Sequence, residues 1–215
     1  MRLGRVLAAV AVTALAVRVV RSRHVRFMHP DGRTFEGELE VWGDATGAAL
    51  LDRPGRHPVT VRISKGAGTK PHWPDVMGIG VRVTGDEPID LLVSSCGRGR
   101  LGRHVPVPRR SFDTVYGSIA AYRTGSGRKI YLGARARLGA TLEALATGPG
   151  LITFDVDGRP VARVTLGRPL PSAVDAALAF DPVRNIAPDL HPIGLLHRSR
   201  AVAYPLSQKW RGAKV

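Results

Sequence analysis

The chain contains very little cysteine and few aromatic residues. Its single cysteine among 215 residues, Cys96, excludes an intramolecular disulfide framework, a cysteine-rich zinc site and an iron–sulfur cluster. A zinc site built from histidine and carboxylate ligands stays open. Aromatic residues make up only 6%, but 44% hydrophobic and 23% charged residues are typical of a globular chain with a buried core. This composition excludes a disordered chain, a collagen-like repeat and a polytopic membrane protein.

Lysine is also scarce, whereas arginine is abundant. Only five of the 32 basic residues are lysine, so 27 are arginine, and the net charge is +15. The arginine guanidinium is planar, permanently charged and suited to carboxylates and phosphates. The positive charge would suit a partner such as a nucleic acid, an anionic membrane or an anionic cofactor. It is explained equally well by a composition that prefers arginine to lysine without any such partner. Charge alone therefore does not select a partner.

The first 23 residues differ from the rest of the chain. Arg2 and Arg5 precede an uncharged run over 6–17, and further arginines follow it. This run is shorter than the roughly 20 residues that span a bilayer. It fits the apolar region of a signal peptide, with small residues at Ala14 and Ala16 where a signal peptidase cleaves. An export signal or membrane anchor, a helix packed on the domain and a disordered tail are the three interpretations, so the chain is either cytoplasmic or exported and membrane-tethered.

Beyond Phe27, alternating apolar and polar residues predict strands rather than long helices. We expect strands over 34–42, 58–64, 78–83, 90–93, 129–136, 151–156 and 160–166. Asp157-Gly158 between two apolar runs predicts a hairpin. The Gly/Arg-rich segment 97–128 is expected to be a long loop with a short helix, 169–179 to hold one helical turn, and the chain from His197 to form a short helix. Many short strands joined by polar turns favour a closed antiparallel barrel.

Two features could carry chemistry. His29 lies beside a turn at the start of a strand, although a lone histidine is more often structural than catalytic. Arg200 and Tyr204 are four residues apart, which places a guanidinium over a phenol on one face of a helix. A hydrogen-bonding arginine favours the phenolate, and phenolate is a known ligand of haem iron. Ordinary helix packing produces such pairs as well.

Taken in order along 26–211, these segments resemble the haem catalase family. Residues 26–41 read R-F-M-H-P-D-G-R-T-F-E-G-E-L-E-V where the family has R-V-V-H-A-x-G-x-x-x-x-G-x-F-E-V, and 58–64 read P-V-T-V-R-I-S where the family has P-V-x-V-R-F-S. Further matches in the same order lie at 67–68, 75–83, 90–95, 160–171, 178–182 and 200–212.

The resemblance implies a mainly β fold with an antiparallel catalase-like barrel, a few short helices and a C-terminal helix that carries the haem ligand. Residues 24–215 would form this minimal haem-binding domain, after the apolar segment 1–23. The implied cofactor is haem b. Tyr204 would be the axial iron ligand as a phenolate, and Arg200 would keep it deprotonated. Three further arginines match those that bind the haem carboxylates in the family, namely Arg26, Arg62 and Arg211.

On the opposite face of the haem, the resemblance implies that His29 is the general acid–base and that the Ser64 hydroxyl orients its imidazole. Ser94 falls where the family has an asparagine that positions peroxide, or Ser95 does if the register slips by one. A second departure is Gln208, where the family has histidine. The family's long wrapping segment and helical C-terminal domain have no counterpart here, so we expect a more open haem.

The expected function is a haem-dependent peroxidase that reduces hydrogen peroxide or organic hydroperoxides at the expense of an unidentified reductant, with weak catalase activity. The chain is expected to be a monomer or homodimer, to contact a membrane through 1–23 and to bind no nucleic acid. The alternatives are a non-enzymatic haem-binding protein on the same barrel, and a basic barrel that binds nucleic acid or membrane without haem. The basic stretch 97–110 fits contact with a polyanion, but a solvated loop beside the active site is favoured.

Overall fold

The computed structural model describes residues 29–146, 148 and 150–194. The segment 1–23 and the helix expected from His197 lie outside the described residues. So do four of the predicted site residues, which are Arg26, Arg200, Tyr204 and Arg211.

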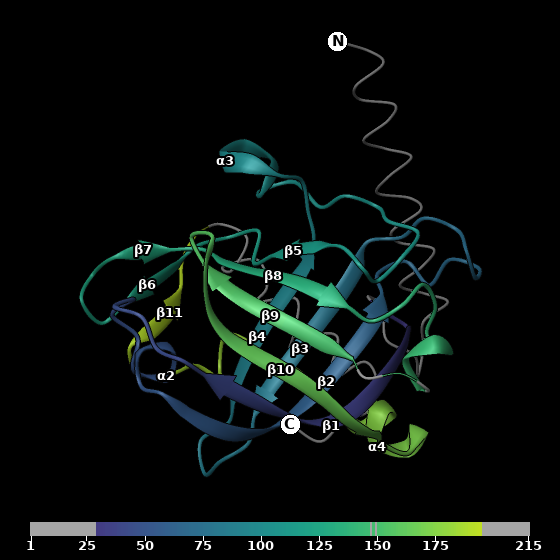
Figure 1. Cartoon of the computed structure of the whole chain (residues 1–215), viewed down its shortest axis with the longest axis horizontal. Coiled ribbons are helices and arrows are strands. Elements are labelled where there is room, and N and C mark those ends of the chain that lie inside the picture. The colour runs from purple at the N-terminus through teal and green to yellow at the C-terminus, as the bar shows by residue number, and fades with distance from the viewer. Residues whose placement is uncertain (1–28, 147, 149, 195–215) are drawn as a thin grey trace.

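The described part of the chain is built mainly from strands (Figure 1). The strands are β1 (Asp31–Val41), β2 (Gly55–Lys65), β3 (Met77–Val83), β4 (Ile89–Ser95), β5 (Val115–Gly117), β6 (Tyr122–Thr124), β7 (Lys129–Ile130), β8 (Leu132–Arg137), β9 (Leu151–Val156), β10 (Arg159–Pro169) and β11 (Leu190–Pro192). The short helices are α2 (Ala49–Asp52), α3 (Gly99–Gly102), α4 (Ser172–Ala177) and the 3-10 helix η1 (Ala144–Ala146).

Eight of the strands close into a barrel in the order β1-β10-β9-β8-β5-β4-β3-β2, and every neighbouring pair is antiparallel. Strands β11, β6 and β7 form a small separate sheet. The predicted closed antiparallel barrel is therefore confirmed. Closure leaves no free edge on the barrel sheet, which removes its exposed backbone donors and acceptors.

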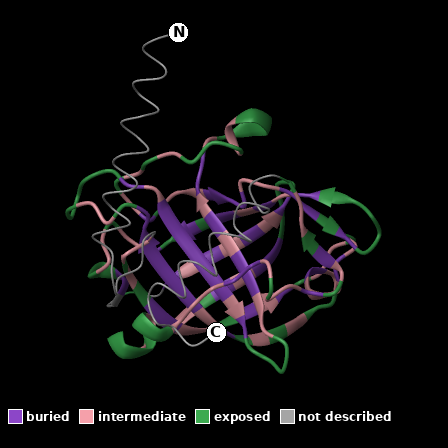
Figure 2. Cartoon of the chain, turned by 180° about the vertical axis from the view of Figure 1, so that it is seen from behind, coloured by how far each residue is buried: buried purple, intermediate pink, exposed green. Residues whose placement is uncertain are grey.

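The barrel interior is filled by hydrophobic side chains, mainly aliphatic, that alternate with residues directed to the outer face. Buried residues lie along all the long strands of the barrel (Figure 2). On β2 the buried inward residues are Val59, Val61 and Ile63, whereas Arg62 and Ser64 point to the outer face. Because the interior is packed, a ligand site has to lie on the outer face or at a barrel end. Within the described residues, no helix is long and apolar enough to cross a membrane.

Most of the predicted strands appear at the expected positions, and the Asp157-Gly158 hairpin is confirmed. Both turn residues have positive φ, 51° and 90°, as a tight two-residue hairpin between twisted strands requires. The run over 129–136 is not one strand: it divides into β7 and β8, because its first residues pair with β6 in the small sheet and the rest pair within the barrel. The prediction for 97–128 was incomplete. That segment holds α3, but it also contributes β5 and β6, because pairing with β4, β8 and β11 stabilises three-residue strands that local alternation does not reveal.

Candidate functional site

A row of very small residues crosses the outer face of four neighbouring strands. Gly32 on β1 pairs with Ser64 on β2, Ser64 with Gly78 on β3, and Gly78 with Ser94 on β4. All four lie on the side of the sheet away from the aliphatic core, because side chains alternate between the two faces. The row therefore forms a shallow surface on which a larger group can lie close to the backbone.

His29 lies against this row. Its backbone N–H donates to the Gly66 carbonyl at 3.0 Å, and its φ of 56° turns the chain sharply just before β1. Its ring is so close to Gly78 that a Cβ at that position would approach Cε1 to 2.4 Å and Nδ1 to 2.7 Å. Glycine at this position is thus what allows the imidazole to rest on the sheet.

Ser64 holds the imidazole from one side. Its Oγ lies 3.0 Å from His29 Nδ1 and 3.4 Å from the Gly78 carbonyl oxygen. When the hydroxyl donates to that carbonyl, Nδ1–H donates to Oγ, and Nε2 is left as a proton acceptor. In the other tautomer Oγ donates to Nδ1 and Nε2 carries the proton. The pair can therefore present either a base or an acid at Nε2, as general acid–base chemistry requires.

The structure distinguishes Ser94 from Ser95. Ser94 is half-buried on the same outer row as Ser64 and Gly78. Ser95 is fully buried, accepts a hydrogen bond from the Met77 N–H at 3.0 Å and donates to the Val107 carbonyl at 2.7 Å. Ser94 therefore shares the surface with His29, whereas Ser95 holds the loop that follows β4.

Arg62, predicted to bind a haem carboxylate, lies two residues before Ser64 on β2 and therefore on the same outer face. Its side chain is only 4% exposed, and it contacts Asp175 of α4 through Nε at 2.8 Å and Nη2 at 3.4 Å. Thr34 also donates to Asp175. The guanidinium lies against Gly32, where a Cβ would approach its Cζ to 2.6 Å. The site thus places a buried cation beside the His29 row, with an internal carboxylate as its counter-ion.

Sequence reasoning did not assign roles to Asp175 or to Phe180, which also lies on this face. The Phe180 ring covers Gly80, where a Cβ would approach its Cζ to 3.1 Å. A buried carboxylate, Asp90, holds the backbone around it by accepting bonds from Arg82 and from the Asp181 N–H, each at 2.7 Å. The match over 178–182 marked this segment, but Asp175 carries no local signal because its partner is 113 residues away.

A cavity of about 370 Å³ opens at the barrel end where β2 finishes and β3 begins. Its wall includes Asp31, Arg33, Lys65, His72 and Glu143. Neighbouring Arg33 helps to lower the pKa of Glu143, although hydrogen bonds from its own backbone N–H and from Thr141 contribute more. Gly32 is the one member of the row that lines this cavity, and His29, Ser64 and Ser94 do not line it.

The loop over 66–76, which forms one side of this cavity, is held by two buried charges. The Lys65 ammonium donates to the carbonyls of Thr69 and Lys70, each at 2.8 Å. Asp75 accepts from three backbone N–H groups, those of Ala67, Thr69 and Val76. Burial alone would raise the pKa of Asp75, but these hydrogen bonds to the charged form outweigh it and lower the pKa.

Cys96 is buried, and burial raises the pKa of its thiol. Within the described residues, no group of histidine, cysteine and carboxylate side chains could hold a metal ion. The outer face fits a planar cofactor such as haem, because it combines a row of small residues with an oriented imidazole. Arg62, predicted to bind a haem carboxylate, is paired with Asp175 in this structure. The residues predicted to hold the iron lie outside the described part of the chain.

The sequence matches no protein-family model and no curated protein. Its fold, however, is similar to those of catalases. A bacterial catalase has a TM-score of 0.64 at 16% identity, covering 87% of this chain and 57% of the catalase. For a fungal catalase the TM-score is 0.70 at 14% identity, covering 94% and 62%. For catalase A from Saccharomyces cerevisiae it is 0.66 at 13% identity, covering 94% and 64%.

These likenesses establish a catalase-like fold. The chain spans less than two thirds of the length of each of these catalases.

Proposed function

We propose that the protein is a haem-dependent peroxidase that reduces hydrogen peroxide or organic hydroperoxides. The observation that carries the proposal is the His29–Ser64 pair, with Nδ1 held at 3.0 Å and the ring resting on Gly78. A protein that only stores or carries haem needs no oriented acid–base group beside it. The catalase-like fold and the catalase-like order of sequence motifs support the same conclusion.

Several residues of this chain would hold the cofactor. Tyr204 would provide the axial phenolate, and Arg200 would keep it deprotonated. Arg62 would face a haem carboxylate from the described side, with Arg26 and Arg211 as further partners. When bound, haem would supply an iron centre that gives two electrons to the peroxide and recovers them from the reductant, so that the peroxide is reduced and the reductant is oxidised.

The chain itself moves the proton. His29 Nε2 takes a proton from one peroxide oxygen and returns it to the other, so that the leaving group departs as water or as an alcohol. Ser64 keeps the ring in place during both transfers, which avoids a reorientation between them. Ser94 can donate a hydrogen bond to the peroxide from the same face, but its side chain is shorter than that of an asparagine.

The short Ser94 side chain favours peroxidase activity over catalase activity. Disproportionation needs a second peroxide held accurately at the same site, whereas a peroxidase needs only access for a reductant. We therefore expect weak catalase activity beside peroxide-dependent oxidation of a small reductant.

The test is to express the full chain with ample haem and to compare it with Tyr204→Phe, His29→Gln and the control His191→Gln. The control removes an exposed histidine of β11. We expect a Soret band with high-spin ferric features that changes in Tyr204→Phe. His29→Gln should keep the haem but lose peroxide turnover by about 100-fold or more, because general acid–base catalysis contributes that much.

A protein that binds haem but turns over no peroxide would instead be a haem carrier. A protein that takes up no haem would refute the cofactor itself. Equal losses of peroxide turnover in His29→Gln and His191→Gln would show that His29 has no specific role in proton transfer.

A further inference from the structure

The loop over 97–105, here called the α3 loop, exposes its two large aliphatic side chains, whereas two of its polar side chains contact the rest of the protein. Leu101 is 85% exposed and Val105 55%. Arg103, in contrast, stacks on the Tyr131 ring at 4.8 Å and pairs with Asp157 at 3.4 Å. His104 Nδ1 bonds to the Ile119 carbonyl at 2.9 Å, and its ring meets Tyr131 edge-on.

Contacts within the loop keep these aliphatic side chains exposed. Cys96 and Pro106 close its base with an antiparallel bridge, and the Gly97 N–H donates to the Val105 carbonyl at 3.1 Å. Gly97 and Gly102 are so close that a Cβ on Gly97 would approach the Gly102 carbonyl oxygen to 2.8 Å. The loop is therefore a closed unit, and its short helix stands away from the barrel as an exposed segment (Figure 2). This arrangement holds Leu101 in water.

The other strongly exposed apolar side chain lies at the same barrel end. Trp73 is 65% exposed and belongs to the loop between β2 and β3. That loop is tied to the one after β4 by an antiparallel bridge between Asp75 and Arg109. The three most exposed large hydrophobic side chains of the described residues are thus gathered in two joined loops.

The same two loops, 66–76 between β2 and β3 and 96–114 between β4 and β5, are strongly basic. They carry Lys70, Arg98, Arg100, Arg103, Arg109 and Arg110. Their two carboxylates, Asp75 and Asp113, are each bonded to backbone N–H groups. Among the described residues, neither Arg98 nor Arg100 forms an ion pair.

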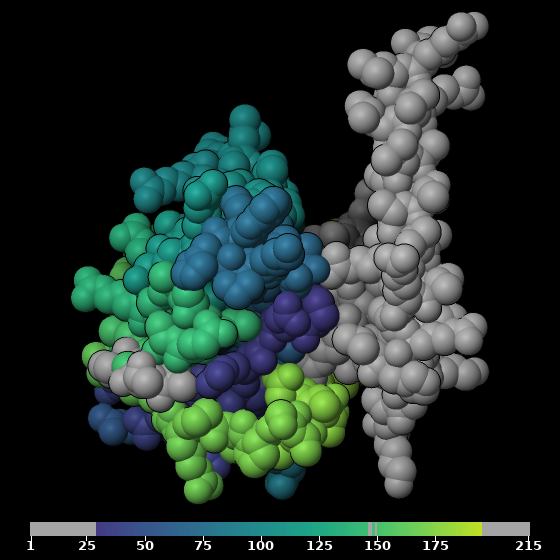
Figure 3. Space-filling model, turned by 90° about the vertical axis from the view of Figure 1, so that its right-hand side faces the viewer, coloured from purple at the N-terminus to yellow at the C-terminus, as the bar shows by residue number. Residues whose placement is uncertain are grey.

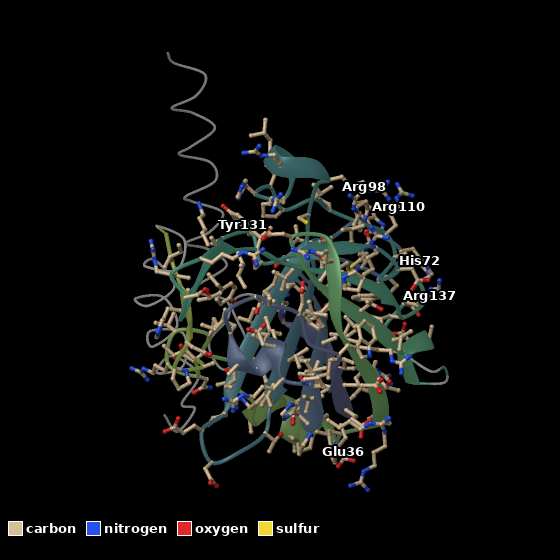
Figure 4. The ribbon with its side chains drawn as sticks, turned by 60° about the vertical axis from the view of Figure 1, so that its left-hand side comes forward. Glu36, His72, Arg98, Arg110, Tyr131 and Arg137 are labelled. Atoms are coloured by element: carbon tan, nitrogen blue, oxygen red, sulfur yellow. The ribbon has the colours of Figure 1, made fainter. Side chains whose placement is uncertain are left out.

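The charge is also uneven along the chain and in space. Residues 97–137 contain ten lysines and arginines but only one carboxylate, Asp113. Figure 4 shows Arg98 and Arg110 pointing outward from the upper part of the molecule, whereas the labelled carboxylate, Glu36, lies at its lower side in this view. Figure 3 shows the loops of this basic end projecting above the body of the molecule.

We infer that this end of the barrel docks on an anionic lipid bilayer, with Leu101 inserted and the surrounding arginines on lipid phosphates. A nucleic acid would engage the charge, but it would leave Leu101 and Val105 in water without a partner. An interfacial membrane contact uses all three kinds of side chain, because aliphatic residues enter the acyl boundary, tryptophan lies at the headgroup level and arginine binds phosphate. The inference does not depend on the proposed function.

The experiment follows the α3 loop itself in the full chain, because 1–23 could also bind lipid. In a Cys96→Ala background, Leu101→Cys and the control Val174→Cys carry an environment-sensitive fluorophore. Val174 is an exposed apolar residue of α4 that lies away from the two loops. The vesicles are phosphatidylcholine with or without phosphatidylglycerol.

We expect the label at 101 to brighten and shift to the blue with anionic vesicles only, and the label at 174 to stay unchanged. Adding Arg98→Gln and Arg100→Gln should raise the vesicle concentration for half-response by about 30-fold, since each arginine at an anionic surface contributes roughly a factor of five. The matched charge control is Arg53→Gln with Arg56→Gln, near the start of β2 at the other barrel end, and it should have far less effect.

Three results would overturn the inference. The label at 101 could stay unchanged while the protein sediments with anionic vesicles, which would assign the contact to another segment. It could respond equally to neutral vesicles or together with the label at 174. It could also respond to duplex DNA and not to vesicles, which would make the surface a nucleic-acid site.

Discussion

Removing the carboxylate of Asp175 should destabilise the protein, because it leaves the Arg62 guanidinium buried without its counter-ion. The Arg62 side chain is 4% exposed and that of Asp175 is 19% exposed, so water can compensate the carboxylate better than the guanidinium. Two contacts join them, at 2.8 and 3.4 Å. The consequence of breaking the pair therefore depends on which partner is left behind.

The magnitudes follow from this asymmetry. Breaking a buried pair from one side costs about 3–5 kcal/mol. Asp175→Asn keeps one carbonyl that can accept from Arg62, so we expect a loss of about 3 kcal/mol. Arg62→Met leaves a carboxylate that reaches water and keeps the Thr34 hydroxyl, so we expect about 2 kcal/mol. The double variant should also lose only about 2 kcal/mol, which corresponds to a coupling of about 3 kcal/mol.

The assay is reversible urea unfolding of the full chain, followed by circular dichroism for the wild type, both single variants and the double variant. The matched control cycle uses Arg168→Met and Glu36→Gln. That pair has a shorter contact, 2.7 Å, but its side chains are 77% and 46% exposed. Its coupling should be close to zero because solvent screens both charges. A coupling at Arg62–Asp175 that is no larger than the control would refute the reasoning that burial makes this pair matter.

Three further predictions concern the neighbourhood of the site. Gly78→Ala should displace the His29 ring and lower peroxide turnover by about 100-fold, while urea unfolding changes by no more than about 2 kcal/mol; retained turnover would show that the ring position is unimportant. Asp75→Asn should lose about 2 kcal/mol at neutral pH. Because its folded pKa is lowered, that stabilisation is present above the ordinary carboxyl range and is lost as the pH falls through the lowered value, so the two unfolding curves should converge in acid. Lys65→Met should loosen the loop over 66–76 and speed amide hydrogen exchange there, with exchange in β9 as the unaffected reference.

The pattern of strands was accessible from sequence because it depends on local alternation. The runs over 58–64, 78–83 and 151–156 each lie within an observed strand, since one face of each strand meets the core and the other does not. The shortest strands escaped prediction. β5 has three residues and is stabilised by its neighbours β4 and β8 rather than by its own pattern.

The candidate site, like the strands, could be predicted only in part from the sequence. His29, Ser64 and Ser94 could be chosen from motif order, and the barrel places them on one outer row through the pairing of β2, β3 and β4. The choice between Ser94 and Ser95 needed the structure, because a one-residue step moves a side chain to the opposite face of the sheet. The predicted roles of Tyr204 and its neighbours remain predictions.

By itself, the amino-acid sequence determined the strand-rich fold class and the hairpin at Asp157-Gly158, because alternation along a strand and the residues of a tight turn depend on neighbours in the chain. Only the pairing of β1 to β4 brought the small residues into the row on which the His29 ring lies. Only the tertiary structure decided that Asp175 faces Arg62 and that Leu101 and Trp73 share one basic barrel end. Those contacts join segments far apart in sequence. They exist because closure of the barrel brings these segments together, and no local pattern records which strands will be neighbours.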